Sequence, residues 1–292
     1  MVALLGLSAR LLGGAALGLV LQASLAAAGP RFVPSADGVR IAYETRGRGE
    51  PAVVLVHGWS CDRTYWKEQL APLAGKFQVV TVDLAGHGAS GRNRRAWTIA
   101  SFGGDVAAVV EKLGLRRVVL VGHSMGGDVV AEAARLLPGR VDGLVWVDTY
   151  KQLGTFRTPE QVQTMVSSFR ADFRKTTRVF ARLMFARGAD PALVERVVAD
   201  MSSAPPAVAL PSMEAAVSYD REMPGALRAL GLPVVAINPD RPPSDAVALA
   251  RHGVGLELMS GVGHFPMLEA PQRFNELLVR TIERIPRPEP TR

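Results

Sequence analysis

The segment from Gly122 to Gly126 reads Gly-His-Ser-Met-Gly, and Ser124 at its centre has surroundings that favour nucleophilic chemistry. Four apolar residues precede the segment, and a stretch with helical spacing follows it. A serine on a tight turn between a strand and a helix holds its hydroxyl clear of the sheet, near backbone N–H groups and the positive end of the helix dipole. Because glycines lack side-chain bulk, they permit such a turn. The segment therefore predicts a nucleophile elbow with Ser124 as the attacking residue.

Three other segments occur in order along the chain: VHGWS at 56–60, DLAGHGAS at 83–90 and GVGHFPMLEAPQRFN at 261–275. Together with the elbow, they resemble the α/β-hydrolase-fold serine hydrolases of the esterase and lactonase kind, both in order and in spacing. The resemblance extends from about Arg31 to the end of the chain and is weakest in the middle. It implies an α/β fold with a mostly parallel central sheet, helices on both faces and an inserted helical cap.

The resemblance also places His264, which follows the last predicted strand, over the serine. A serine hydroxyl is a poor nucleophile near neutral pH, and it needs a base such as histidine whose pKa lies close to the working pH. We therefore expect His264 to be the base. The other four histidines are expected to be structural or, in the last case, exposed: His57, His87, His123 and His252.

Two backbone N–H groups are expected to bind the oxyanion that forms during the reaction. They belong to Met125, which follows the nucleophile, and to Trp59, which follows His57 and Gly58. Neither side chain needs to take part. The Trp59 indole is expected to form a wall of the substrate pocket, and the alternative is that it packs in the core.

The acid that orients the base has two main candidates. The family's usual acid follows the seventh strand in a Gly-x-x-Asp setting, but this chain has INPDRPPSD there, with Asp240 and Asp245 and no glycine. A second family position follows the sixth strand, where LVWVDTY places Asp148. Asp148 and Asp240 remain equal alternatives, and Asp245 is a weaker third. Any of them would stabilise the imidazolium of His264.

Apolar runs alternate with helical stretches along most of the chain, which predicts a parallel sheet covered on both faces. A hairpin is expected first, with strands at 31–35 and 39–47 joined at Asp37-Gly38. The later runs predict buried strands at 52–58, 77–83, 118–124, 144–148, 233–238 and 256–260, and a helix is expected at 271–285.

Between Tyr150 and Leu232 the strand pattern stops, and the residues read as helices broken at Pro205-Pro206 and at Pro211. We interpret this segment as a cap over the carboxyl edge of the sheet. The predicted divisions are residues 29–149 for the first part of the core, 150–232 for the cap and 233–292 for the second part. Several cap side chains are candidates for an apolar substrate cavity or for packing: Phe156, Met165, Phe169, Phe173, Phe180, Met184 and Phe185.

Residues 1–28 have the pattern of a secretory signal peptide, with one arginine, an apolar run and a terminal Ala-Ala-Ala. This pattern predicts export to the periplasm or beyond, with cleavage near Gly29 and no stable membrane span afterwards. An uncleaved anchor is the alternative. The chain has a single cysteine, Cys61, so the mature chain cannot form an internal disulfide.

The formal charge of +7 comes from scattered basic residues without interleaved aromatics, which argues against nucleic-acid binding. No metal-ligand spacing and no phosphate or dinucleotide loop occurs in the sequence, so no cofactor and no metal are expected. The expected partner is a small-molecule substrate, and the sequence does not fix the oligomeric state.

The expected function is hydrolysis of an ester or lactone bond in a small to medium, partly apolar substrate, through an acyl-enzyme on Ser124. Two alternatives use the same fold. One is a ligand-binding protein with little or no turnover, and the other is a cofactor-free haloperoxidase-like or lyase-like enzyme. Fold and triad alone do not select among these functions.

Overall fold

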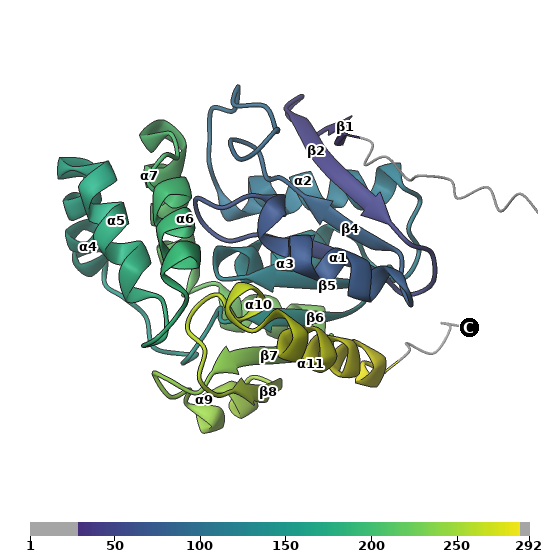
Figure 1. Ribbon diagram of the computed structural model, residues 1–292. Helices are drawn as coiled ribbons and strands as arrows, with labels where there is room; N and C mark the ends of the chain where they lie inside the picture. The colour runs from purple at the N-terminus through teal and green to yellow at the C-terminus, as the bar shows by residue number, and fades with distance from the viewer. Residues whose placement is uncertain (1–28, 287–292) are drawn as a thin grey trace, which may run out of the picture.

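The computed structural model describes residues 29–286, and the predicted signal peptide lies outside them. A single eight-stranded sheet forms the centre of the protein, with helices packed on both faces and a further group of helices to one side (Figure 1). Within residues 29–286, no helix is long and apolar enough to cross a membrane. The predicted α/β fold with a mostly parallel central sheet is confirmed.

The strands follow the order β1-β2-β4-β3-β5-β6-β7-β8 across the sheet. The β1–β2 and β2–β4 pairs are antiparallel, and the other neighbours are parallel. The strands are β1 (Arg31–Pro34), β2 (Arg40–Arg46), β3 (Ala52–Val56), β4 (Val79–Val82), β5 (Val118–His123), β6 (Val141–Val147), β7 (Val234–Pro239) and β8 (Val254–Met259).

Each predicted strand is found, because its sequence suits its position in the sheet. The central strands β3, β4, β5 and β6 are buried along their whole length, as expected for apolar runs covered on both faces. The opening hairpin turns where the sequence predicted. Gly38 has a φ of +80°, and its amide donates to the carbonyl of Ser35 at 2.8 Å.

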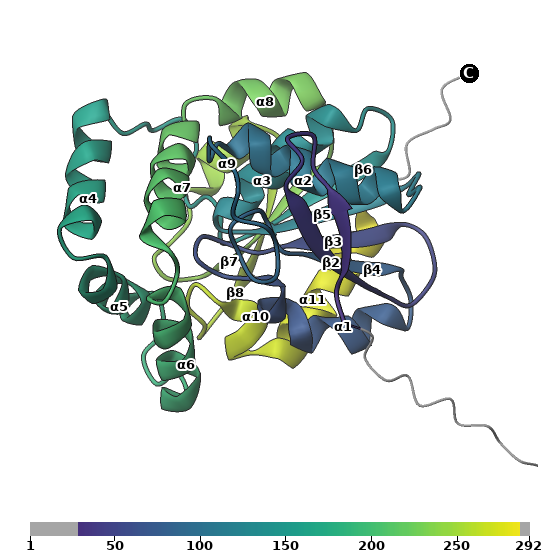
Figure 2. The same ribbon diagram turned by 90° about the horizontal axis from the view of Figure 1, so that it is seen from above.

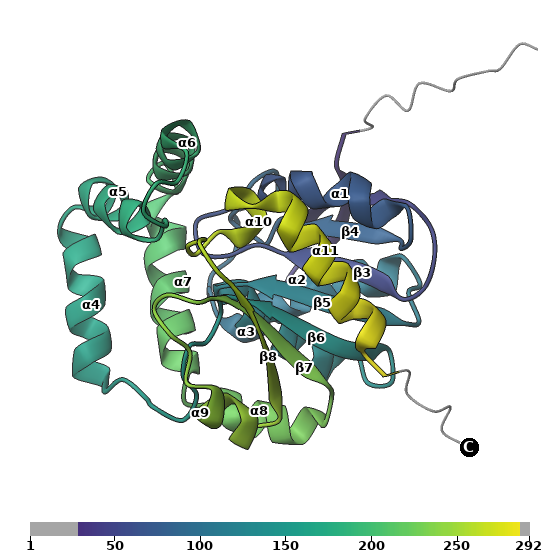
Figure 3. The same ribbon diagram turned by 60° about the horizontal axis from the view of Figure 1, so that its bottom comes forward.

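Helices cover the two faces of the sheet (Figure 3). One face carries α1 (Lys67–Ala74), α10 (Pro266–Glu269) and α11 (Pro271–Arg284). A short 3-10 helix, η1 (Arg63–Trp66), directly precedes α1. The other face carries α2 (Ile99–Lys112), α3 (Met125–Leu136) and α8 (Met223–Leu230), and α9 (Ala246–Arg251) lies beside β8. The largest fully buried side chains between these layers include Trp66, Phe102, Trp146 and Phe274.

The helices between β6 and β7 lie within the segment predicted as a cap, and most of them stand apart from the sheet (Figure 2). They are α4 (Pro159–Ala171), α5 (Phe173–Leu183), α6 (Pro191–Met201), α7 (Pro206–Tyr219) and α8. The predicted break at Pro211 is wrong, because α7 continues through this residue. A proline inside a helix removes one backbone hydrogen bond. Burial of Val208, Ala209, Ser212 and Met213 on either side of it keeps α7 in place.

A buried ion pair fixes the long loop between β4 and α2. The Arg94 guanidinium donates to both carboxylate oxygens of Asp105, and Asp105 also accepts from the amide of Ala85 at 3.0 Å. Both side chains are at most 1% exposed. The same loop lies against the cap, since a Cβ on Gly86 would stand 2.5 Å from a methyl carbon of Val208. The ion pair therefore supports the loop on which part of the cap rests.

Replacing Arg94 with methionine should lower the free energy of unfolding by about 3 kcal/mol, because the Asp105 carboxylate would stay buried without its cation. Urea denaturation of Arg94→Met and wild type measures this difference. Arg284→Met is the matched control, since Arg284 pairs with Glu257 at the surface, and its effect should stay within about 0.5 kcal/mol. Equal losses in the two variants would contradict the interpretation.

Candidate active site

Ser124 lies on a strained turn between β5, which ends at His123, and α3, which begins at Met125. Its backbone φ is +52° and its ψ is −123°, a conformation that L-residues rarely adopt. The neighbouring glycines are needed for space. A Cβ on Gly122 would stand 2.2 Å from the carbonyl oxygen of Gly126, and one on Gly126 would stand 2.6 Å from that of Val56. The predicted elbow is therefore present in the backbone.

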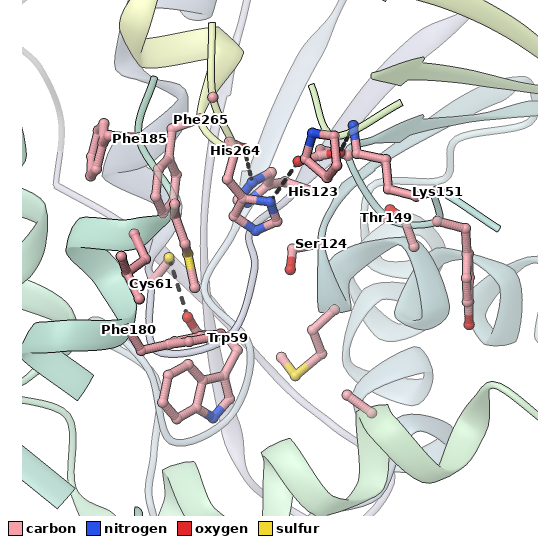
Figure 4. Close-up of a pocket in the computed structure, with 18 of the residues that line it drawn as sticks. Trp59, Cys61, His123, Ser124, Thr149, Lys151, Phe180, Phe185, His264 and Phe265 are labelled. Atoms are coloured by element: carbon pink, nitrogen blue, oxygen red, sulfur yellow. Dashed lines mark hydrogen bonds and ion pairs between the residues drawn. The ribbon is translucent and has the colours of Figure 1, made fainter. Parts of the chain in front are cut away.

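His264 and Asp148 form a hydrogen-bonded pair beside the elbow. The Nδ1 atom of His264 lies 2.8 Å from Oδ2 of Asp148, and both residues line the same cavity as Ser124 (Figure 4). Asp148 directly follows β6 and has a φ of +47°, and its amide donates to the carbonyl of Ile237 on β7 at 3.0 Å. The structure thus brings three predicted site residues together from the ends of β5, β6 and β8.

The other two candidate acids take different positions. Asp240 follows β7 and lines the cavity, while the Asp245 side chain caps α9 by accepting from the amide of Ala248 at 2.9 Å. In the part of the chain that the structure describes, Asp148 is the carboxylate that pairs with His264. The geometry therefore favours Asp148 over Asp240 and Asp245.

Lys151 contacts the same carboxylate from its other side. Its Nζ atom lies 2.9 Å from Oδ1 of Asp148 and 2.9 Å from the carbonyl oxygen of Pro239. Burial by itself would raise the pKa of Asp148, but the hydrogen bond from His264 and the nearby lysine together hold it below its usual value. The sequence analysis missed Lys151, although its place three residues after a candidate acid was a usable signal.

The two predicted oxyanion amides belong to segments that lie next to Ser124. Met125 is the first residue of α3, so its N–H has no acceptor within the helix. The loop that carries Trp59 passes close to the serine, because a Cβ on the preceding Gly58 would lie 3.1 Å from Cβ of Ser124. The Trp59 ring forms part of the cavity wall, and its Nε1 donates to the carbonyl of Ala209 on α7 at 2.7 Å.

The histidines that the sequence analysis set aside are held by the backbone. His57 accepts from the amide of Leu84 at Nε2, and Nδ1 of His87 bonds to the carbonyl of Ala85. Burial lowers the pKa of His57 to about 4 and that of His87 to about 3, so both rings are neutral at pH 7. His252 is half-buried, not exposed as expected, because it packs beside Gly154.

His123 supports the loop that carries the candidate base. Its ring is 4.7 Å from that of His264, centroid to centroid, and its Nε2–H donates to the carbonyl oxygen of His264 at 2.8 Å. Burial lowers the pKa of His123 to about 3, which keeps the ring neutral. The side chain therefore fixes the backbone of His264 without adding charge.

The cap docks directly on the loop of His264. The amide of His264 donates to the carbonyl of Met184 at 2.8 Å, and Gly263 lets the two segments approach, since a Cβ there would stand 2.4 Å from the same oxygen. The Glu269 carboxylate accepts from the amides of Gly263, Phe265 and the cap residue Ala186 at 3.0 to 3.2 Å. We call these contacts the cap seam. Glu269 lies in the segment 261–275 that resembles the family, but the sequence predicted no role for it.

A cavity of about 1150 Å³ joins the cap to the elbow. Of the predicted cap side chains, Met165, Phe180, Met184 and Phe185 line it, whereas Phe169 and Phe173 are buried against the Trp59 ring. Phe156 is exposed at the surface instead. The wall also includes the buried carboxyl of Asp128, which accepts from the Tyr150 hydroxyl at 2.6 Å.

Within residues 29–286, no three side chains of histidine, cysteine, aspartate or glutamate gather in a way that could hold a metal ion. The groups that face the cavity near Ser124 can instead transfer a proton and hold a developing negative charge.

The sheet order, the elbow and the inserted helices together define an α/β-hydrolase fold. The sequence profile described as the alpha/beta hydrolase family matches residues 53–277, and the chain belongs to that family.

Similar proteins include esterases and a lactone-degrading enzyme. A thermophilic esterase from Thermogutta terrifontis is 26% identical with a TM-score of 0.74, over 88% of this chain and 99% of that one. A structure described as an N-acyl homoserine lactone degrading enzyme is 26% identical with a TM-score of 0.71, over 86% and 99%. A non-heme haloperoxidase from Rhodococcus erythropolis is 41% identical over 112 residues, which are 38% of this chain and 40% of that protein. The matched segments span less than half the length of the curated relatives.

Gly122→Ala should destabilise the protein by about 1 to 3 kcal/mol, because the added methyl group collides with the fixed backbone at Gly126. Gly104→Ala in α2 is the matched control. A Cβ at this position meets no atom within 4 Å, so the change should stabilise by about 0.5 to 1 kcal/mol through helix propensity. Thermal unfolding of both variants checks the contrast, and equal shifts of Tm in the same direction would refute it.

Proposed function

We propose that this protein is a serine hydrolase that cleaves an ester or lactone bond in a small to medium, partly apolar substrate. The observation that carries the proposal is the hydrogen bond between His264 and Asp148 in the cavity of the strained Ser124. An imidazole oriented by a carboxylate supplies the base that a serine nucleophile requires. Because similar proteins include esterases, ester hydrolysis is the first reaction to test.

In the proposed first step, Nε2 of His264 takes the proton of Ser124 while Oγ bonds to the carbonyl carbon of the substrate. The amides of Trp59 and Met125 hold the resulting oxyanion. Asp148 holds the ring through Nδ1 and stabilises the imidazolium. His264 then gives its proton to the alkoxide leaving group as the carbon–oxygen bond breaks, which leaves an acyl group on Ser124.

In the second step, His264 takes a proton from water, and the hydroxyl adds to the acyl carbon. Collapse of this intermediate returns the proton to Ser124 and releases the carboxylic acid. In a lactone the leaving alkoxide and the acyl group belong to one molecule, so the product is a single hydroxy acid. No step consumes a redox equivalent or a co-reactant other than water.

The lining of the cavity supports a partly apolar substrate. The cap contributes Phe180, Met184 and Phe185 beside the elbow, and a volume of about 1150 Å³ exceeds what a short ester needs. The esterase and the lactone-degrading enzyme named above share the fold over most of their length, which supports both substrate classes. Partial similarity to a non-heme haloperoxidase makes peroxide-dependent halogenation the comparison reaction.

Ser124→Ala should lower hydrolysis of p-nitrophenyl butyrate by at least about 10³-fold, because alanine lacks the hydroxyl that forms the proposed acyl-enzyme. The measurement uses the chain from Gly29 onward, and circular dichroism confirms that the variant folds. Short lactones and peroxide-dependent halogenation are assayed in parallel. A wild type that is inert on esters and lactones alike would contradict the proposal and favour a ligand-binding protein, while halogenation without hydrolysis would favour the haloperoxidase alternative.

Asp148→Asn should lower kcat by about 10³ to 10⁴-fold, because the amide no longer holds the tautomer that accepts the serine proton. Asp240→Asn is the matched control, and its kcat should stay within about threefold of wild type, since Asp240 makes no contact with His264 among the described residues. The reverse order of the two effects would make Asp240 the acid.

A further inference from the structure

We propose that Lys151 is a positioning residue that holds Asp148 in place and offsets part of its negative charge, so that His264 remains an unprotonated base at lower pH. This inference rests on the proposed function only where it concerns the rate of ester hydrolysis. Its structural basis is the arrangement of contacts on the two oxygens of one carboxylate.

The Asp148 carboxylate lies between two nitrogen groups. Oδ2 faces Nδ1 of His264 at 2.8 Å, and Oδ1 faces Nζ of Lys151 at 2.9 Å. The Asp148 side chain is 8% exposed and that of Lys151 is 25% exposed, so the carboxylate is buried while solvent screens part of the charge of the lysine. The imidazolium form of His264 and the ammonium of Lys151 therefore interact with the same negative charge, and each weakens the attraction that the carboxylate exerts on the other.

The end of β7 and the loop that follows it fix Lys151 in this position. Its side chain donates to the carbonyl of Pro239, and its own carbonyl accepts from the amide of Asp245 at 2.7 Å. The side-chain amide of Asn238 donates to the carbonyl of Tyr150, the preceding residue, at 2.8 Å. The loop that was expected to carry an alternative acid thus holds the cation that contacts Asp148.

The sign of the effect follows from Coulomb's law. Asp148 alone would favour the protonated ring of His264, which cannot accept a proton from Ser124. A cation on the far side of the carboxylate opposes that preference. Without Lys151, the ring would keep its proton to a higher pH, and the acid limb of the rate profile would move upward.

The other charged and titratable groups around His264 are either neutral or not paired with the Asp148 carboxylate in the described structure. His123 contacts the ring but is neutral, because burial lowers its pKa to about 3. The Glu269 carboxylate accepts from the backbone amides of Gly263 and Phe265. The remaining charged groups that line the cavity are Asp128, Arg157, Arg187, Asp220, Asp240 and Arg241, and none of them is paired with the Asp148 carboxylate in the described structure.

The test is the pH dependence of kcat/KM for p-nitrophenyl butyrate in wild type, Lys151→Met, Lys151→Gln and Lys151→Arg. Both neutral variants should move the acid limb upward by about 0.5 to 1 pH unit, and Lys151→Arg should restore the wild-type limb. The glutamine amide can still donate to Pro239, so this variant separates the charge from the hydrogen bond. Arg251→Met, which removes a cation of α9 outside the cavity lining, is the control for net charge and should leave the limb in place.

A uniform loss of rate with an unmoved acid limb would overturn the inference, because Lys151 would then act only on packing. The inference would also be overturned if Lys151→Met moved the acid limb and Lys151→Gln left it at the wild-type pH, since loss of the charge would then not be the cause. NMR titration of the His264 ring proton gives the same comparison without substrate, with the signal assigned from His264→Gln. If wild type hydrolyses no ester, the proposed function fails, and this titration still decides whether Lys151 acts on His264.

Discussion

Backbone strain at the carboxyl ends of three neighbouring strands is the constraint on which the site depends. Within residues 29–286, the non-glycine residues with positive φ are Ser60, Ser124 and Asp148, which follow β3, β5 and β6. Such conformations persist only where the surrounding structure holds them. Here the parallel ladder does so: the amide of Ser124 bonds to the carbonyl of Val147, and that of Asp148 bonds to Ile237 on the next strand. The sheet thus sets the positions of Ser124 and Asp148, the proposed nucleophile and acid.

The rest of the site is assembled by contacts between loops. The carbonyl of Pro239 at the end of β7 positions Lys151 against Asp148, and the ring of His123 on β5 hydrogen-bonds to the carbonyl of His264. The cap adds the carbonyl of Met184 to the same loop. Asp148, His123 and Met184, which contact the proposed base His264, therefore belong to different elements that are all attached to the buried sheet.

Local sequence patterns were sufficient to predict the strands, most helices and the elbow, because apolar runs and flanking glycines act over a few residues. The choice between Asp148 and Asp240 was not available from the sequence, since it depends on where two loops meet in space. The helix break predicted at Pro211 was wrong for a related reason. Burial of side chains along α7 outweighs one lost hydrogen bond, and burial depends on the tertiary structure. The contacts of Lys151 with Pro239 and of Glu269 with Ala186 also join segments that lie far apart in the sequence.

The cap seam links the cap directly to the loop of His264, the proposed base. The carbonyl of Met184 and the amide of Ala186 are tied to the loop of His264, directly and through Glu269. A molecule large enough to lift this part of the cap would enter the cavity and, in doing so, draw the imidazole away from Ser124. Such a molecule would occupy the enzyme without reacting. Discrimination by size would then appear as a fall in turnover number with little loss of affinity, so that oversized esters act as inhibitors.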